Sequence, residues 1–285
     1  MSKFILNADD FGMSKAYNKA IMEGAVDGIL KSASLVANGE AFDEACKVVI
    51  PASPDLGIGV HLNIIEGKSL LSDLDRLTDA NGEFNNSFGQ LMLKALNKGD
   101  KVFMEQVEKE FRAQIEKVKS NVPNVTHIDS HVHVHSIPPI FELVCKLAKE
   151  YGISQIRTQY EKLYVVPDVF KHLTMKYPVN VIKIALLDFF TLINRKKVAQ
   201  YGLKTNDYLI GVGYTSMMSS LTVSYGLLAL RNMKDIVAEA LIHPCRYEDG
   251  TIDNHFVEFQ ITKNKKLKEK IEKIGFEITN YVEEN

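Results

Sequence analysis

KFILNADDFG (residues 3–12) is an apolar run that ends in two adjacent carboxylates and a glycine. The run Phe4–Ala8 has the composition of a buried β-strand, and a charge is costly to bury unless it is paired or bound to a metal. Asp9 and Asp10 therefore indicate a polar site where this first strand ends. Gly12 suits the turn by which the chain leaves that site.

Further apolar runs alternate with helical patterns along the chain. Ser14 is the expected N-cap of a helix that runs to about Gly28, and apolar residues at 103, 107, 111, 115 and 118 predict another. A third helix is expected over Ile140–Tyr151, with Gly152 as its C-cap. The predicted strands are Phe4–Ala8, Ala33–Val36, Gly57–Leu62, Thr126–Asp129, Gln155–Arg157, Tyr208–Val212 and Glu239–Ile242, with weaker candidates at Val179–Leu186 and Phe276–Asn280.

Strands that alternate with helices predict the α/β class. We expect a (β/α) barrel of the TIM-barrel type with seven or eight parallel strands. The length suits a single domain over residues 1–285, with a long polar loop insertion at about 64–100. An open doubly wound sheet is the alternative. No GxGxxG motif follows the first strand and no GxxxxGK[ST] motif occurs, which disfavours nucleotide-binding versions of either architecture.

The composition restricts the partners and the compartment. The net charge is −2, so no basic field suggests nucleic acid or an anionic membrane as a partner. No apolar run is long enough for a transmembrane helix, and the first residues do not resemble a secretory leader. Cys46, Cys145 and Cys245 are odd in number and far apart, which indicates reduced thiols in a cytoplasmic protein.

Histidines gather where predicted strands end. His61 closes GIGVHLN (57–63), His243 lies in AEALIHP (238–244), and four more crowd into HIDSHVHVH (127–135). Ligands bind beyond the carboxyl ends of parallel strands, so these side chains are expected to converge with Asp9 and Asp10. His172 and His255 are isolated, and we interpret them as surface or packing residues.

A cluster of imidazoles beside carboxylates favours a metal site. Imidazole with carboxylate is a normal ligand set for a catalytic divalent ion, whereas a lone histidine is more often a packing residue. In an extended segment His127, Asp129, His131, His133 and His135 would share one face, with about 6.6 Å between alternate residues. They are then too far apart to bind one ion together, so we expect only one or two of them to be ligands. We expect the others to support a ligand or to contact substrate.

The two adjacent acids admit several interpretations. Neighbouring residues on a strand point to opposite faces, which fits a pair of glycosidase carboxylates poorly. The pair is explained better if one acid binds metal and the other transfers a proton. A role as a turn or N-cap residue would explain only one of the two acids. Arg157, at a predicted strand end, suits either a bidentate pair with a catalytic carboxylate or a salt bridge with Glu161. His243 suits a proton donor or an ordinary buried histidine.

Four segments together resemble the YdjC-like carbohydrate deacetylases. They are ILNADDFGMS, GIGVHLN, THIDSHVHVH and ALIHPCR, in that order, between residues 4 and about 245. The resemblance implies a (β/α) barrel and a metal-dependent hydrolase that removes the N-acetyl group from N-acetylglucosamine-containing oligosaccharides, of the chitooligosaccharide or diacetylchitobiose type. By that resemblance the functional residues are the metal ligands Asp10, His61 and His131, the general base Asp9, the general acid His243 and the base-orienting Arg157.

Several alternatives stay open at this point. The resemblance implies magnesium, whereas two imidazoles and a carboxylate suit zinc equally well. Another metal-dependent amidohydrolase or phosphoesterase on a β/α barrel is the second enzyme class, although such enzymes usually carry an HxH pair after the first strand. A sugar-binding module without catalysis would need aromatic platforms, and the chain has no Trp. Phosphorylation of the substrate, for which Lys162, Arg195 and Lys196 are candidate ligands, and a homodimer also remain open.

Overall fold

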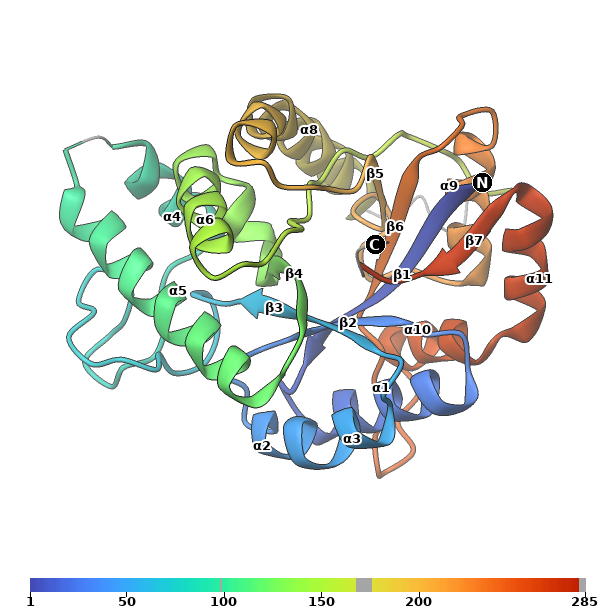
Figure 1. Ribbon diagram of the computed structural model, residues 1–285, viewed down its shortest axis with the longest axis horizontal. Helices are drawn as coiled ribbons and strands as arrows, with labels where there is room; N and C mark the ends of the chain where they lie inside the picture. The colour runs from blue at the N-terminus through green and yellow to red at the C-terminus, as the bar shows by residue number, and fades with distance from the viewer. Residues whose placement is uncertain (98, 168–175, 282–285) are drawn as a thin grey trace.

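A curled parallel sheet forms the centre of the molecule. The computed structural model describes residues 1–97, 99–167 and 176–281. The strands within these residues are β1 (Ser2–Phe11), β2 (Ser32–Leu35), β3 (Gly57–Leu62), β4 (Val125–Ser130), β5 (Tyr208–Ile210), β6 (Val237–Ile242) and β7 (Phe276–Thr279). Their order is β4-β3-β2-β1-β6-β5, and every pairing is parallel. The sheet curls into a half-barrel, with β1 near its middle (Figure 1).

Strand β1 carries two neighbours on one edge, because it is longer than the strands beside it. Its first residues, from Ser2 to Ile5, pair with β7, and its later residues, from Asn7 onward, pair with β2. Its other edge pairs with β6 from Lys3 to Ala8. The carboxyl end of β1 therefore lies between the ends of β2 and β6, where two flanking strands can supply side chains to one site.

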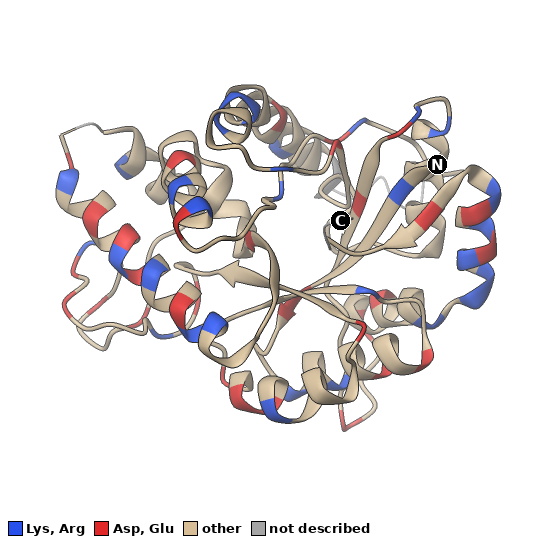
Figure 2. Ribbon diagram, viewed as in Figure 1, with Lys and Arg blue, Asp and Glu red and all other residues tan. Residues whose placement is uncertain are grey.

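Helices surround this sheet on the outside (Figure 1). They are α1 (Lys15–Asp27), α2 (Phe42–Glu44), α3 (Ile50–Ala52), α4 (Phe88–Leu96), α5 (Lys101–Asn121), α6 (Pro138–Glu150), α8 (Lys176–Tyr201), α9 (Ser220–Leu230), α10 (Asn254–Lys263) and α11 (Lys265–Ile274), with a π-helical turn η1 (Ala45–Val49) and a 3₁₀ segment η2 (His131–Ser136). Acidic and basic residues are interspersed along α5 and α11 (Figure 2). This mixture is typical of solvated outer faces.

The predicted helices are confirmed. Helix α1 begins after Ser14 and ends before Gly28, although the Ser14 side chain makes no capping hydrogen bond. All five apolar positions predicted to form one face of α5 are fully buried. Asp100 caps that helix by accepting a hydrogen bond from the Phe103 N–H group. Helix α6 ends at Glu150, and Gly152 takes the left-handed conformation that a helix end favours.

The α/β class with parallel strands is confirmed, but the closed TIM barrel of seven or eight strands is wrong. Val179–Leu186, a weak strand candidate, lies inside α8, because a short apolar run does not distinguish a strand from a buried helix. Gln155–Arg157 forms only isolated bridges, from Ile156 to Ile128 and from Gln155 to Lys204. Within the described residues the sheet therefore ends at β4 on one side and at β5 on the other.

The sheet carries buried polar side chains below the predicted site. Asn7 Nδ2 donates to Ser34 Oγ and to Asp9 Oδ1, each at 2.8 Å. Ser32 Oγ donates to Asn7 Oδ1 at 2.6 Å. All four residues are buried, and buried polar groups require such partners. The end of β1 is thus held by side-chain hydrogen bonds to β2 as well as by the strand ladder.

Two other expectations from the sequence bear on the structure. No helix within the described ranges has the length and hydropathy needed to cross a membrane. Cys46, Cys145 and Cys245 are all free thiols, as expected.

Candidate metal centre and active site

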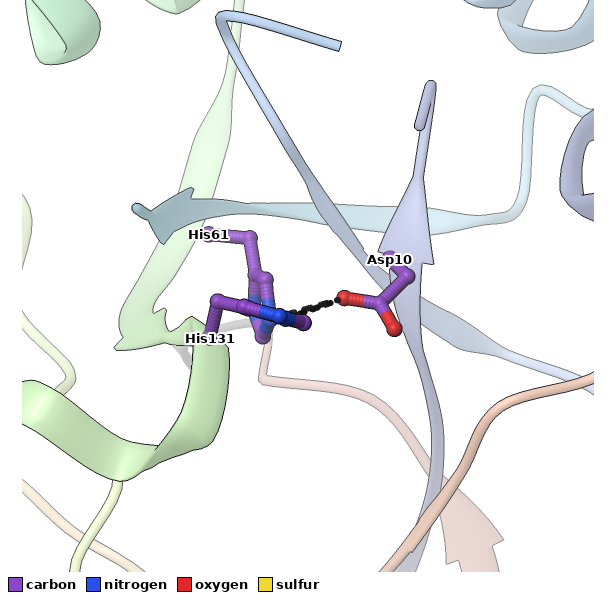
Figure 3. A group of neighbouring side chains, drawn as sticks. All are labelled: Asp10, His61 and His131. Atoms are coloured by element: carbon purple, nitrogen blue, oxygen red, sulfur yellow. Dashed lines mark hydrogen bonds and ion pairs between the residues drawn. The ribbon is translucent and has the colours of Figure 1, made fainter. Parts of the chain in front are cut away.

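Three of the predicted side chains converge at the carboxyl end of the sheet. Asp10 comes from β1, His61 from β3, and His131 directly follows β4 (Figure 3). Asp10 Oδ1 lies 2.8 Å from Nδ1 of His131 and 3.4 Å from Nε2 of His61. One ligand atom from each of the three lies within 4.8 Å of the others. The set offers one carboxylate and two imidazoles around a common point, which suits a divalent cation.

An irregularity in β1 separates the two adjacent acids. Asp10 has a φ of 61°, in the left-handed region, and the β1–β2 register shifts between Ala8 and Phe11. Such bulges redirect a side chain, and strained backbone of this kind is concentrated at functional sites. Gly12 follows with a φ of 82°, and a Cβ there would lie 2.9 Å from Leu35 Cδ1. The requirement for glycine in the turn is therefore both conformational and steric.

Asp129 fixes the orientation of His61. The β3–β4 register pairs these residues, and His61 Nδ1 lies 2.7 Å from Asp129 Oδ1. A carboxylate accepts the ring N–H there, so Nε2 is the nitrogen directed to Asp10. Ligand histidines in metal sites commonly have such a second partner. Asp129 is one of the alternate residues in 127–135 of which those that do not bind metal were expected to support a ligand or to contact substrate, and its contact with His61 agrees with the first of these expectations.

The three converging groups also differ electrostatically from the other histidines. Burial opposes ionisation of Asp10, yet His131 and His61 hold its pKa well below the usual range. Burial likewise opposes the charged form of His61, but Asp129 and Asp10 raise its pKa to about 10. The pKa of His131 rises to about 9 because Asp10 and Glu66 outweigh burial. Positive charge is therefore favoured beside Asp10, whether protons or a cation supply it.

Asp9 is paired with Arg157, although one of its oxygens also lies within 4.8 Å of ligand atoms of His61 and Asp129. Arg157 Nη1 and Nη2 donate to the two oxygens of Asp9, each at 2.8 Å, and both side chains are buried. This is the bidentate pair that was one of the two expectations for Arg157. The alternative, a salt bridge with Glu161, is wrong: the Glu161 carboxylate accepts the backbone N–H groups of residues 211–213.

Arg157 contacts two further acids, Asp129 and Glu239, and no role was predicted from the sequence for Glu239. Its Nη2 lies 2.7 Å from Asp129 Oδ2, and its Nε and Nη2 donate to Glu239 Oε1 at 2.8 and 2.6 Å. These carboxylates raise the pKa of Arg157 well above its ordinary value, in spite of burial. The guanidinium thus joins residues from β1, β4 and β6.

His243 follows β6 and lies next to the end of β1, since the register pairs Ile242 with Ala8. Its backbone N–H donates to Glu258 Oε2 at 2.5 Å, and its Nδ1 lies 3.5 Å from the same oxygen. Burial opposes protonation, but Glu258 raises the pKa of His243 above 6.5. The imidazole is one-quarter exposed, which leaves it accessible from outside. His255 packs against it, as a packing residue would, whereas His172 lies outside the described residues.

The remaining histidines of HIDSHVHVH are not arranged as one extended face. That expectation fails after Ser130, because Val132 and His133 take φ values of 52° and 59° and the chain forms η2. Burial lowers the pKa of His127 and of His135 to about 4, and it lowers that of His133 as well. Burial therefore disfavours the charged form of these three rings, whereas the neighbouring carboxylates favour it in His61 and His131.

The candidate phosphate ligands point elsewhere. Lys162 Nζ donates to the carbonyl of Ala229 at 2.9 Å, and Arg195 donates to the carbonyl of Asp207. Lys196 is exposed on α8. None of these contacts involves a residue of the metal centre, so they do not support a phosphate site there.

Comparison with known proteins agrees with the motifs. The model of the YdjC-like protein family matches residues 3–273. A carbohydrate deacetylase from Brevibacillus brevis is 38% identical over 151 residues, carbohydrate deacetylase 1 from Listeria innocua 42% over 153, and a carbohydrate deacetylase from Clostridium beijerinckii 40% over 151. Each alignment covers 53% of this chain and 57%, 59% and 58% of the respective relative. The chain thus spans less than two thirds of the length of these relatives.

Solved structures support the fold. A protein from Enterococcus faecalis V583, described as a proposed cellobiose-phosphate cleavage protein, superposes with a TM-score of 0.73 at 23% identity. The superposition covers 98% of this chain and 97% of that one. An uncharacterized protein from Agrobacterium tumefaciens C58 gives a TM-score of 0.51 at 9% identity. At these identities the likeness concerns the fold alone.

Proposed function

The chain belongs to the YdjC-like protein family, and from this premise we propose that it is a metal-dependent carbohydrate deacetylase. The proposed reaction is hydrolysis of the N-acetyl group of an N-acetylglucosamine-containing oligosaccharide, with release of acetate. One observation carries the proposal. Asp10 faces two imidazoles, while Asp9, one residue earlier, is held by Arg157.

We assign Asp10, His61 and His131 as the ligands of a divalent cation. Their donor atoms lie close enough to share one ion, and Asp129 already directs Nε2 of His61 to the common point. A bound divalent ion supplies positive charge that polarises the amide carbonyl and lowers the pKa of water. The imidazoles favour zinc, while family resemblance favours magnesium, so both metals belong in the assay.

Asp9 is the proposed general base. Arg157 fixes the plane of its carboxylate by two parallel hydrogen bonds. Each carboxylate oxygen has two lone pairs, so this pairing leaves capacity to accept a proton from the attacking water. Arg157 pairs with Asp9, whereas both imidazoles contact Asp10, which is why we assign the two acids to different tasks.

His243 is the proposed general acid. Cleavage of the amide requires a proton on the departing nitrogen. Burial lowers the pKa of His243, but Glu258 raises it overall, which favours the protonated imidazole that can donate this proton. Glu258 fixes the loop that bears it through the backbone N–H. Each of the two proton transfers is worth about 10²–10⁴-fold in rate.

Acetate release tests this function directly. The protein, loaded separately with Mg²⁺ or Zn²⁺, is incubated with diacetylchitobiose, with its phosphorylated form and with monomeric N-acetylglucosamine. We expect release from at least one of these substrates, loss on chelation and recovery on addition of metal. An absence of release from every substrate with both metals contradicts the proposal. Release that persists in the presence of chelator contradicts its metal dependence.

A further inference from the structure

Two edges of the Arg157 guanidinium are occupied by different carboxylates. The edge formed by Nη1 and Nη2 faces Asp9, and the edge formed by Nε and Nη2 faces Glu239 Oε1. The guanidinium is planar and rigid, so a contact on one edge fixes the orientation of the other. Glu239, together with Asp129 beside Nη2, therefore determines the direction from which Arg157 meets Asp9.

The second carboxylate oxygen of Glu239 also accepts a hydrogen bond. The hydroxyl of Tyr281 donates to Glu239 Oε2, while Oε1 serves Arg157. Glu239 lies in β6 opposite Ile5 of β1 and is fully buried. A buried carboxylate needs such partners on both oxygens, because unpaired buried charge is strongly unfavourable.

Tyr281 is anchored at three places. Its hydroxyl bonds Glu239, its backbone carbonyl accepts a hydrogen bond from Gln155 Nε2 at 3.0 Å, and its ring stacks on His127 at 4.1 Å between centroids. His127 is in turn held by Thr126 and Ser34. The first histidine of HIDSHVHVH thus supports a tyrosine that follows the last strand, rather than a metal.

We propose that Glu239 and Tyr281 are positioning residues that set the geometry of Asp9 through Arg157. The contacts run from the Tyr281 hydroxyl to Glu239, from Glu239 to the guanidinium, and from the guanidinium to both oxygens of Asp9. This inference rests on the proposed function, because it gives these residues a part in the reaction of the general base. Among the described residues neither Glu239 nor Tyr281 has a hydrogen bond or ion pair with Asp10, His61 or His131, so their proposed effect on the site passes through Arg157.

Tyr281→Phe removes only the hydroxyl and is the first test. Misplacement of a reacting group by about 1 Å can cost about 10²-fold in rate, so we expect kcat to fall about tenfold or more while KM and metal affinity keep their wild-type values. Tyr214→Phe is the matched control. Both tyrosines are 2% exposed, but the Tyr214 hydroxyl bonds the carbonyl of Tyr164. We expect wild-type kcat in that variant.

Glu239 variants provide a rescue test. Glu239→Ala frees one edge of the guanidinium, and we expect a larger loss of kcat than in Tyr281→Phe. Glu239→Gln keeps an amide oxygen for Arg157 Nε and should recover part of that loss. A merely structural role predicts instead that kcat per folded molecule is unchanged and that thermal stability falls in both variants. That result overturns the proposal.

A readout without catalysis separates this inference from the proposed function. In NMR spectra of protein labelled with ¹⁵N-arginine, restricted rotation of the guanidinium should give separate, slowly exchanging Nη proton signals for Arg157. These signals are assigned by their loss in Arg157→Lys. We expect these signals to merge in Tyr281→Phe and to persist in Tyr214→Phe. Unchanged signals in Tyr281→Phe overturn the inference. A wild-type protein with no deacetylase activity contradicts the proposed function and leaves this spectroscopic test valid.

Discussion

His61 Nδ1 lies 2.7 Å from Oδ1 of Asp129, and both side chains are fully buried. This contact leaves Nε2 of His61 free for the position beside Asp10. We predict that Asp129→Asn lowers affinity for the metal by about 10–100-fold, the usual cost of removing the second partner of a ligand histidine. Titration calorimetry with Zn²⁺ measures the change.

The matched control for Asp129 is Glu110→Gln. Glu110 is also a fully buried acid, but its carboxylate accepts hydrogen bonds from the backbone N–H groups of Leu70 and Leu71 and from the Gln114 amide rather than from a proposed metal ligand. Its substitution should leave metal affinity unchanged. Equal losses in the two variants would show that a general loss of buried charge, and not the orientation of His61, is responsible.

Asp9→Asn separates the proposed base from the proposed ligands. Asparagine has nearly the same shape but cannot take a proton from water at neutral pH. We predict that turnover falls by at least about 10²–10⁴-fold, whereas the bound metal stays at the wild-type amount. Acetate release and elemental analysis on the same sample give both values. Near wild-type turnover in Asp9→Asn rules out Asp9 as the base.

His131→Ala and His133→Ala separate a proposed ligand from a neighbour in the same segment. Of these two histidines only His131 contacts Asp10, while burial lowers the pKa of His133 and its Nδ1 has no hydrogen-bond partner among the described residues. We predict loss of both metal and activity in His131→Ala, and retained metal in His133→Ala. Elemental analysis after dialysis decides the matter. Metal retained by the first variant but lost by the second would reverse the assignment.

Much of the site could be predicted because its residues directly follow strands. Asp10, His61 and His131 lie at or directly after the ends of β1, β3 and β4, and the carboxyl ends of parallel strands share one edge. Local patterns also predicted the bounds of α1 and the buried face of α5. These inferences needed only the direction of each strand, not its exact partners.

The rest depended on long-range pairing that one sequence does not reveal. Glu239 lies in an apolar strand, and its contact with Arg157 follows from the β1–β6 register and the isolated bridge at Ile156. Tyr281 looks like an ordinary aromatic residue after the last strand. The prediction of a closed barrel was wrong because the local patterns of the apolar run in α8 and of the short β5 are ambiguous, and only the strand pairing shows where the sheet ends.

Gly59→Ala tests the packing beneath the site. A Cβ at Gly59 would lie 2.4 Å from Cε1 and Nε2 of the His127 ring, which is itself stacked on Tyr281. We predict a loss of about 1–3 kcal/mol in the free energy of unfolding, measured by urea denaturation. Gly89→Ala in α4 is the control, because a Cβ there meets nothing within 4 Å. Its stability should stay equal or rise, and equal destabilisation of both would contradict the predicted clash.

The pH dependence of the reaction tests Glu258 and His243. Burial lowers the pKa of His243, but the Glu258 carboxylate raises it more, so the imidazole is protonated at pH values where an ordinary histidine is neutral. Glu258→Gln keeps an oxygen for the His243 N–H but removes the charge. The pKa of His243 must then fall, and the alkaline limb of kcat/KM must move to lower pH.

The sign of this shift distinguishes an acid from a base. If His243 donates the proton, Glu258→Gln loses activity first on the alkaline side and keeps it at low pH. The stability that this pair contributes should follow the same direction: present below pH 6.5 and lost as pH rises through the raised pKa of His243. Glu110→Gln, which also removes a buried carboxylate, should leave the limb in place. A limb that moves to higher pH in Glu258→Gln, or does not move, rules out His243 as the general acid under the control of Glu258.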